Sequence, residues 1–185
     1  HHTGYRALAV ESVVEAAENL WIEGRRLNDI GHFTAAAITL SQARELAVGS
    51  PTPDAARILI RIDITMALTD LELHGYPVAA QRLEKATWRA RDLGAPDWLG
   101  LTHIQHGVID ARCGMWSDAS EQLRQAELLF AHIGPVEQCS ALITLGLADL
   151  SLSRVNDAQA SLEQARLLAS KYDLPAHLLN ATHNF

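Results

Sequence analysis

A pattern of small and large apolar residues returns along this chain at nearly constant spacing. A small residue precedes a turn residue, and an aromatic or branched residue, an alanine, a leucine and a second alanine follow. The three fuller copies are Gly24, Gly31, Phe33, Ala36, Leu40, Ala43; Gly107, Gly114, Trp116, Ala119, Leu123, Ala126; and Gly146, Ser153, Val155, Ala158, Leu162, Ala165. A looser copy runs Leu68, Gly75, Ala79, Leu83, Ala86 and lacks one residue after the turn. Such self-similarity predicts a repeat fold, in which each repeat buries its apolar face against its neighbours.

Each copy of the pattern predicts two helices joined by a turn. The apolar residues between the turns follow the helical period, and the composition (48% hydrophobic, 5% aromatic) is rich in the strong helix formers alanine and leucine. Asp54 is predicted to cap the helix that follows Pro53. We therefore expect one all-α helical repeat domain over residues 1–185. Its repeats are expected at about 5–48, 54–93, 97–132 and 135–172, with a partial repeat at 175–185.

The small residues of the pattern are predicted to bring paired helices close together. Gly24, Gly107 and Gly146 fall where two antiparallel helices would approach most closely. A Cβ atom at these positions would push the helix axes apart. The alanine and leucine after each turn supply the matching surface on the second helix. A larger side chain at Gly107 is therefore expected to overpack the contact.

Charge and composition narrow the classes of function. The formal net charge is −7, and 15 Lys and Arg are scattered among 22 Asp and Glu, which argues against nucleic acid as a partner. No apolar run approaches the length of about 18 residues that reads as a membrane span. Cys113 and Cys139 suit a reducing cytoplasm rather than a disulfide framework. The chain begins with His1–His2 and stops at Phe185 within an expected helix, so we interpret it as a piece of a longer protein.

The order of small residue, turn glycine, aromatic, alanine, large apolar residue and alanine resembles the tetratricopeptide (TPR) signature. The resemblance covers nearly all of residues 17–172. It implies a right-handed solenoid of antiparallel helix pairs, with about four repeats and a truncated fifth. The turn residues are 44, 39 and 39 positions apart, against about 34 in the common repeat. Asp110 and Asp149 also replace the tyrosine-like residue that many TPRs carry late in the first helix.

Three short segments carry a narrower resemblance. Residues 20–27, 91–98 and 181–185 are similar to the alanine-rich TPR region of bacterial CHAT-domain proteins, in which a caspase-like protease domain follows the repeats. The alternative resemblance is to the TPR-like array of large bacterial transcriptional regulators of the MalT kind, which also have long repeats. Either resemblance implies that the effector domain lies outside this chain.

One group of side chains has the spacing of a metal site. His103, His106 and Asp110 lie on one helical face and would present two imidazoles and a carboxylate to a metal ion. In the repeat register, however, the two histidines take the places of Leu142 and Leu145, so we expect them to be packed interior residues. The sequence therefore predicts no metal site and no cofactor.

A second group has the residue types of a caspase-like dyad. Such proteases use a His–Gly and a cysteine, and the chain has His106–Gly107 and Cys113. Both lie on one expected helix, two turns apart, whereas a protease dyad draws its members from separate loops or strand ends. We therefore expect no catalytic residue in this chain.

The tryptophans indicate which surface faces a partner. Trp116 follows a turn in the place of Phe33 and is predicted to belong to the core. Trp21 lies one position beyond the apolar Leu20, on a stripe that a TPR array turns toward its concave groove. Ligand contact and packing against the N-terminal extension both remain open for Trp21.

Extended through the repeats, this stripe predicts a partner-binding groove. Its residues are Glu18, Trp21, Arg25, Asn28, Thr65, Thr69, Glu72, Ile104, Val108, Arg112, Ile143 and Leu147, with Ala111 and Leu150 on the same face. The groove changes from polar at one end to apolar at the other. It has too few basic residues for a clamp on a C-terminal carboxylate, and suits an amphipathic helix or an extended apolar segment better. Further repeats or an absent domain would also cover its apolar end.

The repeat pattern, without a convergent catalytic set, predicts a non-enzymatic protein–protein interaction module. We expect a bacterial, cytoplasmic TPR scaffold that binds a peptide or helix, or that regulates an effector domain absent from this chain. Two alternatives stay open: the ligand-sensing array of a MalT-type regulator, and the sensor region of a CHAT-type protease. An exposed terminal repeat would also allow self-association.

Overall fold

The computed structural model describes the backbone of residues 2–183 and the side chains of residues 13–182. Over these residues the chain is helical, without a strand. The elements are α1 (His2–Asp29), α2 (Phe33–Val48), α3 (Pro53–His74), α4 (Tyr76–Asp92), α5 (Pro96–Arg112), α6 (Trp116–Glu127), a 3-10 turn (Phe130–His132), α7 (Pro135–Ser151), α8 (Val155–Lys171) and α9 (Pro175–His183).

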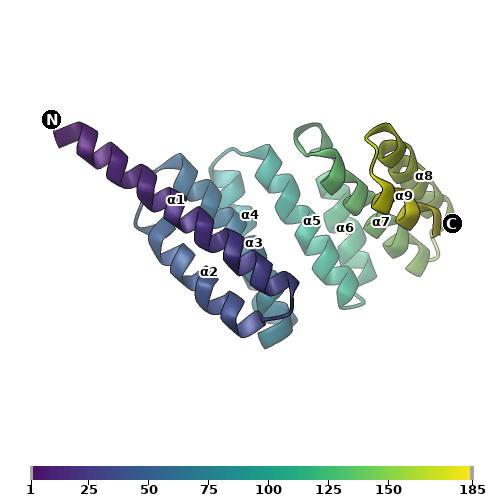
Figure 1. Cartoon of the computed structure of the whole chain (residues 1–185). Helices are drawn as coiled ribbons and strands as arrows, with labels where there is room; N and C mark the ends of the chain where they lie inside the picture. The colour runs from purple at the N-terminus through teal and green to yellow at the C-terminus, as the bar shows by residue number, and fades with distance from the viewer. Residues whose placement is uncertain (1, 184–185) are drawn as a thin grey trace. The chain divides into compact units, whose positions relative to one another are not determined.

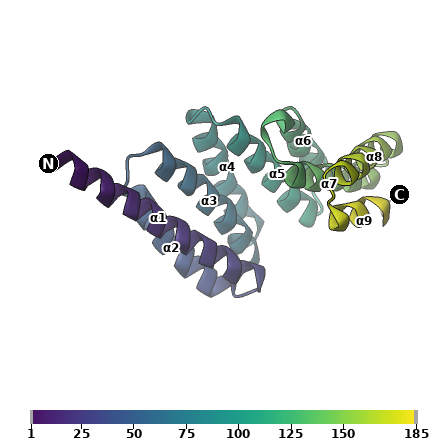
Figure 2. The same cartoon turned by 45° about the horizontal axis from the view of Figure 1, so that its top comes forward.

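The contacts divide the chain into two compact units, which we describe one at a time. The N-terminal unit, residues 1–95, contains α1 to α4, and the C-terminal unit, residues 96–185, contains α5 to α9. Within each unit consecutive helices lie side by side and antiparallel, as Figures 1 and 2 show for α1 with α2 and for α7 with α8. Helix α1 is much longer than α2, and its N-terminal half extends past the end of its partner (Figure 1).

The predicted close approach of paired helices is confirmed. A Cβ atom added to the glycine in the first helix of three pairs would fall closer to a leucine Cγ on the second helix than real atoms approach. The distances are 2.6 Å from Gly24 to Leu40, 2.5 Å from Gly107 to Leu123 and 2.6 Å from Gly146 to Leu162. Each leucine is fully or almost fully buried and covers the backbone of the opposite helix. The glycines are therefore required by the packing of the pairs.

The α3–α4 pair departs from this arrangement. Leu68, which stands at the small position of the looser repeat, is only half-buried, and its neighbour Ala67 is fully buried instead. Ala67 lies twelve residues before Ala79, the same separation as that between Gly24 and Ala36. Because this repeat lacks one residue after the turn, its small position lies one residue earlier than expected, at Ala67 instead of Leu68.

The helix ends correct two predictions. Thr52, not Asp54, caps α3: its backbone is extended and its hydroxyl accepts a hydrogen bond from the Ala55 N–H at 3.2 Å. Pro53 starts the helix one residue earlier because its fixed φ suits the first helical position. Helix α6 ends at Glu127 rather than continuing to residue 132, and the 3-10 turn follows.

The turns inside the pairs use the left-handed backbone region. Gly31, Gly75 and Gly114 have φ between 74° and 82°, where a glycine carries no steric penalty. Ser153 adopts φ 60° at the same place in the last pair, at a cost of roughly 1–2 kcal/mol for a residue with a Cβ atom.

Candidate functional site

The C-terminal unit contains an apolar pocket between α5 and α7, beside the start of α6. Its volume is about 420 Å³. Two helical faces and one aromatic ring form its walls: Val108, Ala111 and Arg112 from α5, Trp116 from α6, and Thr144, Leu147, Leu150 and Ser151 from α7. Pockets that bind small ligands or anchor side chains have volumes of this order.

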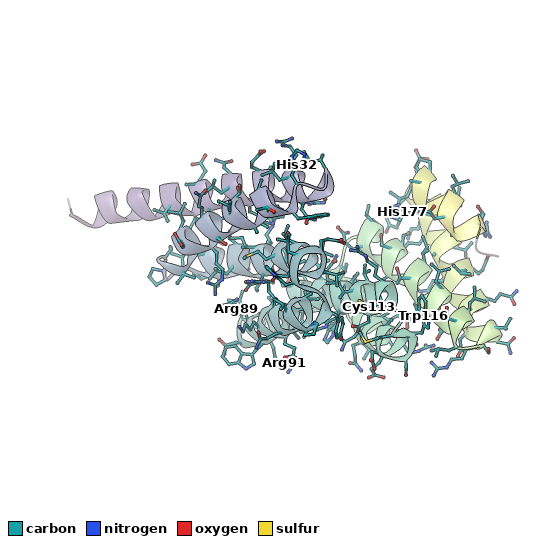
Figure 3. The ribbon with its side chains drawn as sticks, turned by 90° about the horizontal axis from the view of Figure 1, so that it is seen from below. His32, Arg89, Arg91, Cys113, Trp116 and His177 are labelled. Atoms are coloured by element: carbon teal, nitrogen blue, oxygen red, sulfur yellow. The ribbon has the colours of Figure 1, made fainter. Side chains whose placement is uncertain are left out.

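The helical period explains why these side chains meet. Val108 and Arg112 are four residues apart on α5, and Thr144 and Leu147 are three apart on α7, so each pair lies on one face of its helix. Helices α5 and α7 contact each other directly. Trp116 is the first residue of α6, and Figure 3 shows it beside Cys113 where α5 passes into α6.

The hydroxyl groups that line the pocket donate hydrogen bonds to carbonyl oxygens of their own helix. Thr144 Oγ1 donates to the Ser140 carbonyl oxygen and Ser151 Oγ donates to that of Leu147, both at 2.9 Å. Apart from the guanidinium of Arg112, the walls therefore offer apolar side chains and an indole ring. This arrangement can bind an apolar group but provides no acid–base pair for catalysis.

A buried carboxylate holds α7 in place. Asp149 is 0% exposed, accepts hydrogen bonds from Ser120 and Arg124 of α6 at 3.0 and 2.8 Å, and lies 3.5 Å from the guanidinium of Arg154. The next residue, Leu150, lines the pocket. Asp149 therefore fixes the turn of α7 that supplies this wall.

In the N-terminal unit, the structure corrects the predicted groove. Trp21 is only 8% exposed: its indole N–H donates to Thr65 Oγ1 at 2.9 Å, and Arg61 stacks 3.9 Å from the ring centroid. Thr69 is buried and donates to Asn28 Oδ1 at 2.9 Å. These side chains satisfy one another between α1 and α3, so Trp21, Thr65 and Thr69 form an interhelix contact and are not open to a partner.

The other predicted groove residues of this unit are more accessible. Glu18 is half-buried and pairs with Arg61 at 2.6 Å. Arg25 is exposed and lies 4.0 Å from Asp29, and Glu72 is exposed on α3. Contact of these residues with a partner stays a prediction.

At the apolar end of the predicted groove, too, some residues are accessible and others are buried. Val108, Arg112 and Leu147 line the pocket, together with Ala111 and Leu150. Ile104 and Ile143 are instead buried among core residues, because they face the adjacent helices, and they correct the prediction.

Trp116 was expected in the core, but it is half-buried and lines the pocket. Its place after the turn was the signal that predicted burial. The exposed fraction of the ring depends on the distance between α5 and α7 beside it. A local sequence pattern does not predict that distance.

The two histidines of the rejected metal site are half-buried, not interior as predicted. His103 Nδ1 lies 2.8 Å from Gln122 Oε1 of α6, so a polar partner takes the place of the apolar contact that Leu142 makes one repeat later. Among the side chains that the structure describes, no three His, Cys, Asp or Glu residues group as metal ligands. Cys113 is exposed just beyond the end of α5.

One pair of chemically active side chains was not predicted. Ser140 Oγ of α7 lies 3.1 Å from His177 Nε2 of α9. The two residues are 37 positions apart, so no local motif indicates the contact. Within the described part of the chain, no carboxylate is seen to orient the His177 ring, and the pair reads as a tie between two helices.

The comparisons with known proteins agree with the observed architecture. No protein-family model and no curated protein matches the sequence. The crystal structure of the apo form of RapI is similar, with a TM-score of 0.72 and 16% identity over 86% of this chain; the match covers 58% of the RapI chain. TTC0263, a thermophilic TPR protein in Thermus thermophilus, aligns over 90% of this chain and 99% of its own, at 20% identity. Its TM-score of 0.44 supports no structural argument.

No helix within residues 2–183 is both long enough and apolar enough to cross a membrane. The antiparallel helix pairs, the recurring glycine–leucine contacts and the likeness to RapI identify the fold as an all-α, TPR-like helical repeat.

Proposed function

We propose that this chain is a non-enzymatic protein-interaction module of the TPR type, and that the pocket between α5 and α7 binds apolar side chains of a partner peptide or helix. The pocket is the observation that carries the proposal. A concave apolar site on rigid helices is the kind of surface in which anchor side chains of a partner contribute most of the binding energy.

The chemistry of the pocket supports binding rather than catalysis. Its hydroxyl groups donate to carbonyls of their own helix, and its remaining walls are apolar except for Arg112. Arg112 is exposed, so its guanidinium can meet a polar or acidic group that flanks the apolar anchor of the partner.

The same pocket favours a second candidate. Its volume lies within the range of small-molecule sites, so an inducer would fit there if the chain belongs to a MalT-type regulator. In a CHAT-type protein, the partner would be the protease domain of the same polypeptide, and this module would restrain or release it. Both readings keep the expected cytoplasmic location, and both depend on sequence outside this chain.

Selection of peptides from a random display library on the whole chain tests the proposal. We expect the selected peptides to share an apolar anchor and to bind Leu150→Glu at least about tenfold more weakly, because the charge would be desolvated in the pocket. Leu150 is partly exposed, so the variant is expected to fold. Leu167→Glu, on an exposed position of α8 outside the pocket, is the matched control.

Two results would contradict the proposal: no selected peptide, or peptides that bind Leu150→Glu as tightly as the parent. A screen of small apolar molecules, read by the intrinsic tryptophan fluorescence to which Trp116 contributes, separates the second candidate. If the pocket is a small-molecule site, small molecules and not peptides would change the emission. The same molecules would leave the emission of Leu150→Glu unchanged.

A further inference from the structure

A buried aspartate in the N-terminal unit collects arginines from the helices on both sides. Asp63 of α3 is 2% exposed. Arg44 of α2 brings its Nε to 3.5 Å from Asp63 Oδ1, and Arg82 of α4 lies 3.7 Å from the same oxygen. Arg89, also of α4, contacts the other carboxylate oxygen, and Arg82 pairs in addition with Asp70. We call Arg44, Arg82 and Arg89 the arginine cluster.

The charges of the arginine cluster do not balance. Three guanidinium groups face two carboxylates, Asp63 and Asp70, which leaves one positive charge. Burial and the nearby charge of Arg44 lower the pKa of Arg89, as expected for a surplus of positive charge. A surplus cation is costly in a partly desolvated place unless an anion compensates it.

The hydrogen bonds of the cluster are also incomplete. Arg44 Nε is covered from solvent and, among the described residues, finds no acceptor. Among the side chains of residues 13–182, Arg44 pairs only with Asp63, at 3.5 Å, and Arg89 pairs only with the same carboxylate. Their side chains are 38% and 27% exposed, so part of each guanidinium is accessible from outside. A buried donor without an acceptor calls for a physical explanation.

A second cluster of arginines and aspartates, in the C-terminal unit, shows that balance is possible in this fold. There Arg124 and Arg154 face Asp149, and Arg124 also lies 3.7 Å from Asp157. Two arginines thus meet two aspartates, and Ser120 donates a further hydrogen bond to Asp149. A cluster that serves only to tie helices together needs no surplus charge, and this one has none.

We propose that Arg44 and Arg89 bind a carboxylate from outside the chain, carried by an aspartate or glutamate side chain of a partner polypeptide. One outside carboxylate supplies further acceptors for the accessible guanidinium N–H groups of Arg44 and Arg89, beyond the single Asp63 oxygen that each of them meets, and brings the charge of the group to zero. A phosphate dianion would instead leave a net negative charge against the buried Asp63. That the carboxylate comes from a polypeptide rests on the proposed interaction function, whereas the anion site rests on the arginine cluster alone.

Titration of the whole chain with sodium acetate tests the site, read by NMR of the arginine Nε–H groups. We expect the Arg44 and Arg89 signals to shift and saturate with acetate, but not with sodium chloride at equal ionic strength. Signals of Arg124 and Arg154, whose cluster is balanced, serve as internal controls. Inorganic phosphate, at a pH where the dianion predominates, is expected to bind more weakly than acetate.

Three variants connect the signal to the site. Arg44→Gln is expected to weaken acetate binding at least about tenfold at Arg89, because one of the two charge-assisted partners is lost. Arg91→Gln, on the exposed face of the same helix as Arg89 (Figure 3), is expected to leave binding unchanged. Arg44→Lys keeps the charge but not the forked geometry, and provides a second test if Arg44→Gln fails to fold.

The absence of a saturable shift at Arg44 and Arg89, or an equal shift with chloride, would overturn the site. Tighter binding of phosphate than of acetate would overturn the assignment of a carboxylate and point to a phosphorylated ligand. Neither result depends on Leu150→Glu, which acts on residues 96–185 only. The anion site and the proposed peptide pocket can therefore fail separately.

Discussion

The pairs α5–α6 and α3–α4 close comparable interfaces by different means. In α5–α6, Leu123 lies against the bare backbone of Gly107, and the fit is one of shape. In α3–α4, alanine takes the place of the glycine, and Arg82 of α4 reaches both Asp70 and Asp63 of α3. The second interface therefore depends on charge as well as on apolar packing.

The two pairs also differ by one residue in length. The loss of a residue after Gly75 moves α4 relative to the repeat register, so the small position shifts to Ala67. Ala67 and Ala79 are fully buried, so the apolar contact is kept, and Arg82 of α4 adds ion pairs with Asp70 and Asp63 of α3. Shape complementarity and ion pairing are thus alternative ways to join two helices of this repeat, and they respond differently to mutation.

The largest expected effect is in the charged pair. Arg82→Met should lower the free energy of unfolding by about 3 kcal/mol, because it leaves Asp70 buried without its hydrogen-bond donor. Urea unfolding measures the loss. Arg91→Met, an exposed change on the same helix, should cost less than about 0.5 kcal/mol. Equal losses in the two variants would show that the ion pairs do not hold α3 to α4.

A second variant of the charged pair separates charge from packing. Arg82→Met combined with Asp70→Leu should be more stable than Arg82→Met alone, since no carboxylate then remains unpaired at that position. If the double variant is the less stable of the two, lost packing explains the effect and the comparison with α5–α6 loses its basis.

An added methyl group in the shape-based pair should have an intermediate effect. Gly107→Ala places a Cβ atom 2.5 Å from Leu123 Cγ, and we expect a loss of about 1–3 kcal/mol from overpacking. Leu123→Ala alone should lose about 2–5 kcal/mol by creating a cavity. Because the new methyl group fills part of that cavity, the double variant should lose at least about 1 kcal/mol less than the sum. Strict additivity would show that the two residues do not share a contact.

The smallest effect concerns a titratable group inside α7–α8, another pair joined by glycine and leucine. Burial raises the pKa of the Cys139 thiol, whose Sγ lies 3.7 Å from the Ala165 carbonyl oxygen. Above the ordinary thiol pKa of about 8.5 the unfolded chain releases this proton and the folded chain retains it, so stability falls as pH rises.

Comparison of Cys139 and Cys139→Ala, both with Cys113→Ala, isolates that thiol. The free energy of unfolding of the chain that keeps Cys139 should decline more steeply between about pH 8 and pH 10. Parallel pH profiles would contradict the raised pKa.

Much of the fold could be predicted because its determinants are local. The spacing from Gly107 to Leu123 depends only on helical period and turn length, and the turn at Gly114 marks its own position. The α3–α4 exception was visible as a missing residue. Its consequence, the use of Ala67 and Arg82, was not predicted, because it depends on how the two helices shift in three dimensions.

The candidate site was less predictable because it depends on contacts between distant residues. Trp21 and Thr65 are 44 positions apart, and their hydrogen bond turns a predicted groove residue into an interior one. Periodicity placed Val108 and Leu147 on one face, and both line the pocket, but the cavity between them depends on how α5 and α7 pack. The surplus charge of the arginine cluster likewise appears only when α2 and α4 both reach α3.

The glycine–leucine contact also bears on how a chain of this kind can change its length. Gly107 and Gly146 are 39 residues apart, and so are the leucines that cover them. After duplication or deletion of one such stretch, every glycine would still lie against a leucine of the paired helix. No new contact would have to evolve. Insertion or loss of a single residue would break that correspondence, as the residue missing after Gly75 illustrates. Gains and losses of whole repeats should therefore be tolerated more often in the evolution of such chains than small insertions inside a pair.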